Sequence, residues 1–109
     1  MADTIFKGAI AAGSFSARFH SDAGNADSDL LVIAYAANGG GNTDVDQDAA
    51  APGAVAKVDA EGAETGLLEV WVAIGTETDR GTLTVSANGN VVTDEPIKGS
   101  VRWVYAVVA

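Results

Sequence analysis

Three aspartates at alternate positions, Asp44, Asp46 and Asp48, form the clearest chemical pattern in the chain. Calcium takes six to eight oxygen ligands at about 2.3–2.6 Å, and alternate acids in a loop can turn several carboxylates towards one ion. The surrounding stretch, NGGGNTDVDQDAAAPG, has no regular apolar period and is rich in turn-forming residues. The three aspartates are therefore candidate metal ligands, with Ca²⁺ as the ion that fits them.

The same aspartates match only the first half of an EF-hand calcium loop. Ala49 stands where that loop has a glycine, and Val55 stands where it has a glutamate. Asp, Asn and Gly are also the residues that solvated turns use most. Two interpretations of residues 38–53 remain open: a calcium-binding loop, or a solvated connector.

A second candidate site pairs an acid with an aromatic side chain. Glu69 and Trp71 stand two residues apart in GLLEVWVAIG, and alternation along a strand places them opposite the apolar face that includes Val70. An aromatic ring on a sheet face can stack on a sugar or fill a protein interface. We expect Glu69 and Trp71 to be ligand-binding residues, and Trp103, whose strand face is apolar throughout, to lie in the core.

Catalytic patterns are weak. His20 is the only histidine, and its neighbours Ser21 and Asp22 would alternate in direction along a strand, so they do not form a catalytic triad. The absence of cysteine excludes a thiol nucleophile, a disulfide framework and cysteine-bound metal clusters. The glycines of NGGGN lack the lysine and spacing of phosphate-binding loops. We therefore expect that the protein is not an enzyme.

The amino-acid composition predicts the number of domains and excludes some classes of binding partner. The chain has 109 residues, 48% of them hydrophobic, which predicts a single folded domain over residues 1–109. Its net charge of -9 would repel nucleic acid and anionic lipid, and its longest apolar run is far below the roughly 20 residues of a membrane helix. The amino terminus lacks the basic and apolar segments of a secretory signal, which favours a cytoplasmic or virion protein.

The elements that must position these residues are strands. SFSARFH and RGTLTVSA alternate apolar and polar side chains, as half-buried strands do. Asn88-Gly89 follows the second of these and predicts a type I′ hairpin turn back into NVVT. The segments LLVIAYAA and VYAVVA are apolar on both faces, which is typical of central strands or of a subunit interface. The sequence thus predicts an all-β, antiparallel sandwich, jelly-roll or immunoglobulin-like, of about seven or eight strands.

Two functions are compatible with this pattern. The first is a non-enzymatic structural or assembly module that binds copies of itself or decorates a larger assembly, because the strands carry more apolar surface than one small sandwich needs to cover. Its size and acidic composition are similar to those of virion, phage and surface-lattice components, although no motif is shared. The alternative is a carbohydrate- or ligand-binding module that uses Trp71 and Glu69, assisted by calcium.

Overall fold

Strands make up the regular structure of this chain, as the two-residue alternation predicts. The computed structural model describes residues 4–109, which contain nine strands and no helix. In chain order these are β1 (Thr4–Ala11), β2 (Gly13–Ser21), β3 (Asp29–Ala37), β4 (Thr43–Ala50), β5 (Val55–Gly62), β6 (Gly66–Ala73), β7 (Arg80–Ala87), β8 (Asn90–Lys98) and β9 (Val101–Val108).

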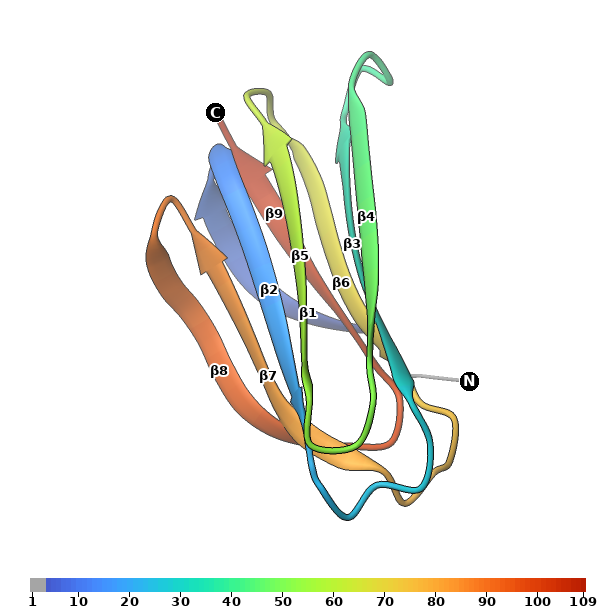
Figure 1. The fold of residues 1–109 in the computed structure, drawn as a ribbon. Helices are drawn as coiled ribbons and strands as arrows, with labels where there is room; N and C mark the ends of the chain where they lie inside the picture. Colours follow the sequence, from blue (N-terminus) through green and yellow to red (C-terminus); the bar gives the residue numbers. More distant parts are fainter. Residues whose placement is uncertain (1–3) are drawn as a thin grey trace.

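The strands form two stacked sheets (Figure 1). One sheet has five strands in the order β1-β9-β6-β3-β4, and the other has four in the order β5-β2-β7-β8. Neighbouring strands are antiparallel, except that β1 runs parallel to β9. The predicted all-β sandwich is confirmed, with this one parallel pair as a departure from a wholly antiparallel fold.

The core lies between the sheets and is built by the inward-facing half of each strand. Its largest members are aromatic: Trp103, Tyr35, Tyr105, Phe15 and Phe19 are all at most 2% exposed. Phe15 of β2 stacks on Tyr35 of β3 with ring centroids 6.0 Å apart, which joins the two layers. Trp103 is therefore a core residue, as the sequence predicts.

The β7–β8 hairpin has the predicted turn. Asn88 and Gly89 both have positive φ, 52° and 82°, as a type I′ turn requires. The Asn88 side chain also accepts a hydrogen bond from the Ser14 amide at 3.0 Å, so the turn is tied to the start of β2. The Asn88 side-chain nitrogen also donates to the Ala11 and Ala12 carbonyls at 3.4 and 3.2 Å, which ties the turn to the corner between β1 and β2.

Residues 43–50 correct the sequence interpretation. They were expected to lie in a loop, but they form β4, which pairs with β3 along its whole length. The sandwich consequently has nine strands instead of about seven or eight. The alternation rule did not predict this strand because the rule expects apolar residues at the inward-facing positions. In β4 these positions hold aspartates.

Candidate functional site

The outer surface of the five-stranded sheet is mostly apolar, with Thr4, Thr43 and Gln47 on its edge strands as uncharged polar exceptions. Its outward positions include four of the large hydrophobic side chains that remain exposed: Phe6 at 64%, Val45 at 63%, Val108 at 53% and Leu67 at 45%. Alanines occupy many of the positions between them. We call this surface the apolar face; its further members are Ala9, Ala11, Leu30, Val32, Ala34, Ala36, Ala49, Ala73, Val104 and Ala106.

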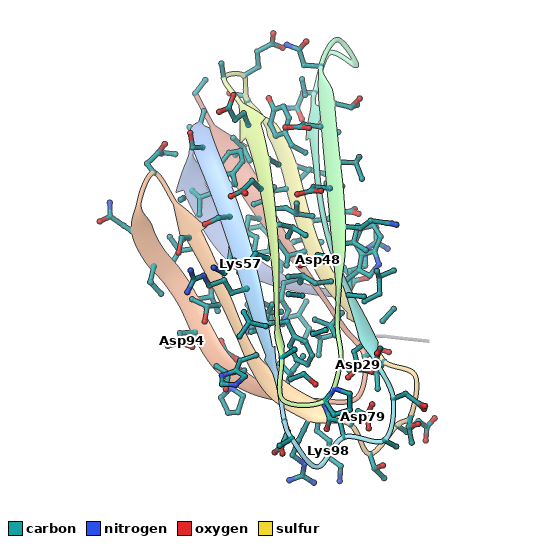
Figure 2. The ribbon with its side chains drawn as sticks, viewed as in Figure 1. Asp29, Asp48, Lys57, Asp79, Asp94 and Lys98 are labelled. Carbon is teal, nitrogen blue, oxygen red and sulfur yellow. The ribbon has the colours of Figure 1, made fainter. Side chains whose placement is uncertain are left out.

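The outer surface of the four-stranded sheet is of the opposite kind. Strands β5, β2, β7 and β8 direct mostly polar and charged side chains outward, with Arg18 beside Lys57 and Thr84 beside Asp94; Val55 and Val91 are the exposed apolar exceptions. Figure 2 shows Asp94 and Lys57 on this layer. One sheet therefore presents an ordinary solvated surface, while the other presents an apolar one of the kind that marks interaction sites.

Glu69 and Trp71 lie at the middle of the apolar face, on its central strand β6. Both are half-buried, and β9 places Arg102 beside them in the sheet. The Arg102 Nη2 donates to Glu69 Oε1 at 2.6 Å, and its guanidinium lies 5.8 Å from the centre of the Trp71 ring. We call these three residues the central cluster. It holds the only charges on the outward positions of the described five-stranded sheet, and they form a neutral pair.

The three aspartates that were predicted as metal ligands bind backbone amides of the opposite sheet. The Oδ2 atoms of Asp44, Asp46 and Asp48 accept hydrogen bonds from the backbone amides of Glu61, Asp59 and Lys57, at 2.9, 3.1 and 3.0 Å. These amides lie on the free edge of β5, in the opposite sheet. Figure 2 shows Asp48 and Lys57 on the adjacent edge strands β4 and β5. The carboxylates thus replace the missing strand partner along this side of the sandwich; we call them the aspartate ladder.

Two carboxylates of the ladder also protect β4 itself. Asp46 Oδ1 accepts from the Gln47 amide at 2.9 Å, and Asp48 Oδ1 accepts from the Ala49 amide at 3.0 Å. An exposed strand edge with free amides is a template for aggregation, and charge at the edge opposes it. The ladder thus accepts hydrogen bonds from backbone amides on the edge strands of both sheets.

The calcium site stays a prediction. Within residues 4–109, no group of three or more His, Cys, Asp or Glu side chains is arranged to hold a metal ion. The aspartates occupy successive inward positions along β4, so each faces its own backbone amide on β5. An ion would compete with these amides for the same oxygens.

We expect Asp46→Ala to lower the free energy of unfolding by about 1–2 kcal/mol, because it leaves the Asp59 amide without its charged acceptor. Urea unfolding measures the loss, and hydrogen exchange should show a faster Asp59 amide. Gln47→Ala, on the outward side of the same strand, is the matched control. Equal losses for the two variants would show that the ladder does not stabilise the edge.

A buried acidic pair lies at the end of the sandwich that the ladder does not reach. Asp29 and Asp79 are each 1% exposed and lie close together among the loops that precede β3 and β7 (Figure 2). Asp29 accepts the Gly75 amide at 3.0 Å, and Asp79 accepts the Ala26 amide at 2.8 Å. The two carboxyls thus fasten the loop after β2 to the loop after β6.

Burial raises the pKa of the Asp29 carboxyl above its ordinary value of 3.8, and its hydrogen bond with Asp79 and the charges of Asp79 and Asp27 raise it further, while the Gly75 amide opposes the shift. The folded protein therefore binds this proton more tightly than the unfolded chain does. The linked stability is full at pH values below 3.8 and is lost as pH rises through the elevated pKa.

We expect Asp29→Asn to raise the melting temperature by a few degrees at pH 8 and to have a smaller effect near pH 4, where the carboxyl is already protonated. The amide oxygen keeps the Gly75 bond and the amide nitrogen can donate to Asp79, while the long 3.3 Å bond from Asn25 Nδ2 is lost and Asn25 keeps its bonds to Ser21 and the Arg80 carbonyl. Asp59→Asn, which removes one exposed charge from β5, is the control. A pH-independent effect, or a loss of stability at pH 8, would contradict the protonated pair.

His20 lies apart from these groups, at the end of β2. It borders an open depression of about 360 Å³ that includes Ser21 and Asp22, next to a second one of about 330 Å³ lined by Arg80 and Lys98. Both are shallow surface features. Among residues 4–109, no hydrogen bond joins His20 to Ser21 or Asp22 side chains, so the structure brings no triad together there.

Comparison with known proteins found no match among family models, curated proteins or solved structures. In the part of the chain that the structure describes, no helix is long and apolar enough to span a bilayer. The candidate site therefore rests on the geometry of the molecule itself. Its strongest feature is the apolar face with the central cluster.

Proposed function

We propose that the protein is a non-enzymatic structural module that assembles through the apolar face, with copies of itself or as a decoration on a larger assembly of the virion or surface-lattice type. The observation that carries the proposal is the contrast between the two outer surfaces. One sheet exposes mainly charged and hydroxyl side chains, with Val55 and Val91 among them, whereas the other exposes Phe6, Val45, Leu67 and Val108 around one neutral ion pair. A protein that works alone gains nothing from this asymmetry, but an assembly module buries the apolar side.

Two further features support assembly through a face instead of an edge. The aspartate ladder accepts three amides on the edge of β5 and two on β4, which opposes strand addition on that side. The described depressions are open and shallow, whereas small-molecule sites are usually deep and mostly apolar. A broad, mostly apolar sheet surface is suited to another protein surface.

Native mass tests the proposal directly. Sedimentation or light scattering between about 1 μM and about 1 mM covers the range of moderate protein affinities. A defined oligomer that forms with rising concentration supports self-assembly. A strict monomer that also fails to join any larger particle when co-expressed with its neighbouring genes would contradict an assembly role.

Carbohydrate binding is the second candidate, and the half-buried ring of Trp71 at the centre of a sheet surface favours it. Glu69 could then accept sugar hydroxyls, with calcium on the aspartates as an accessory ion. A glycan array with calcium and with chelator tests both parts, and we expect Trp71→Ala to abolish any signal. A signal that survives this substitution would remove Trp71 from the site, and one that is equal in chelator would remove calcium.

A further inference from the structure

We infer that the occupant of the apolar face is a second copy of this chain, docked face to face on a two-fold axis over the central cluster, with Glu69 of each copy paired to Arg102 of the other. The inference rests on the proposed function and makes it specific: it names the partner, the sheet and the contact that sets the register. Three observations lead to it: the area of the face, its charge and the state of Arg102.

The area of the apolar face is sufficient for a dimer. Five strands about 4.8 Å apart and about eight residues long, at about 3.3 Å per residue, cover roughly 600 Å². Two such faces together bury about 1,200 Å², which is the lower limit of specific, stable interfaces. The alanines between the larger side chains allow the sheets of two copies to approach to about 10 Å, the usual spacing of packed sheets.

Charge restricts the docking of a second copy to the apolar face. The chain carries a net charge of -9, so two copies repel each other on most of their surfaces. The apolar face is the exception, because its single acid and single base neutralise each other at 2.6 Å. Face-to-face docking also directs the charged four-stranded sheets away from each other, and a basic partner would find no excess of acid on this face.

Arg102 has unused hydrogen-bonding capacity at the centre. Its side chain is 43% exposed, and within the described chain its one acceptor is Glu69 Oε1, which its Nη2 reaches; the exposed part of the guanidinium, and not the buried Nε, is what a partner can contact. Arg and Trp near the middle of an interface are the residues that most often dominate binding. A two-fold axis in the plane of the interface, passing over neighbouring strands β6 and β9, brings a second Glu69 towards each Arg102. This reciprocal contact fixes the register, while the apolar surround supplies the affinity.

Charge reversal tests the reciprocal contact. Glu69→Arg leaves two bases on the face and Arg102→Glu leaves two acids, so each variant alone should dimerise at least tenfold more weakly than the wild type. An equimolar mixture of the two variants should form a heterodimer, because each then meets opposite charge. The double variant Glu69→Arg/Arg102→Glu restores both kinds of pair and should dimerise, which separates loss of binding from loss of folding. Arg18→Glu, on the other outer surface, is the control and should dimerise normally.

The outcomes separate this inference from the proposed function. A wild-type dimer that both single variants leave intact would overturn the inference and keep self-assembly through another surface. Single variants that dissociate but do not recombine would overturn the reciprocal pair. A wild type that is monomeric at every concentration would overturn the second copy as the occupant, while joining a larger particle would still support an assembly role.

Discussion

Replacing Leu67 with aspartate is expected to convert the assembled protein into a monomer. Leu67 is 45% exposed on the central strand β6, and Ala106 of β9 and Ala36 of β3 flank it on the apolar face. A carboxylate there would be desolvated without a partner, and in a symmetric complex it would be buried twice. We expect affinity to fall at least about 100-fold, equivalent to about 2.7 kcal/mol.

Val55→Asp is the matched control for this variant. Val55 is 42% exposed, close to the value for Leu67, but it lies on the outer surface of the four-stranded sheet. Both variants add one negative charge to an acidic protein, so general repulsion changes equally. Sedimentation at several concentrations compares them. Equal dissociation of the two would assign the effect to net charge and not to the apolar face.

Replacing Trp103 with alanine is expected to lower the free energy of unfolding by about 3–5 kcal/mol. Trp103 is 2% exposed and is the largest side chain in the core. Lys7 of β1 lies 4.5 Å from its ring centre and pairs with Glu95 of β8 at 2.9 Å, so the ring also supports the contact between the edges of the two sheets. Such a loss is a large part of the roughly 5–15 kcal/mol that stabilises a domain.

Trp71→Ala removes the same side chain from the outer surface and is the control. Its ring is half-buried and leaves solvent-exposed space, not an internal cavity, so in the monomer we expect a loss of about 1 kcal/mol or less. Urea unfolding followed by circular dichroism measures both variants without relying on tryptophan emission. Similar losses would mean that Trp103 does not hold the core.

The alternation of side chains predicted most strands, but not β4. In β2, β6, β7 and β9 the inward positions are apolar, so the two-residue period is visible in the letters. In β4 the inward positions near β5 are Asp44, Asp46 and Asp48, which accept backbone amides instead of packing. A strand whose inner face hydrogen-bonds to another sheet has no apolar period, and only the tertiary partner reveals it.

The candidate site could be predicted in part. Alternation placed Glu69 and Trp71 on one outward face, and both lie there. Arg102 was missed because its position beside them depends on the pairing of β6 with β9, which are separated by two strands in the sequence. Asp29 and Asp79 are fifty residues apart and meet only when two loops close one end of the sandwich, so no local pattern could bring them together.

The difference between the two outer surfaces could not be predicted from the sequence and became visible only in the structure. Strands β3 and β9 are apolar on both sides, which correctly predicted interior positions in a sheet. The sequence could not say that β1, β6 and β4 complete the same surface with Phe6, Leu67 and Val45, because strand order is a tertiary property. Once the order is known, scattered apolar residues become one continuous face.

Quenching of tryptophan emission by acrylamide tests most directly whether the apolar face becomes covered. The chain has two tryptophans; Trp103 is shielded in the core, so quenching reports on Trp71 at the centre of the face. We predict that quenching falls as the wild type assembles with rising concentration, and that it stays high in the Leu67→Asp variant. Assembly that leaves Trp71 equally quenchable at every concentration would contradict the apolar face as the surface of contact.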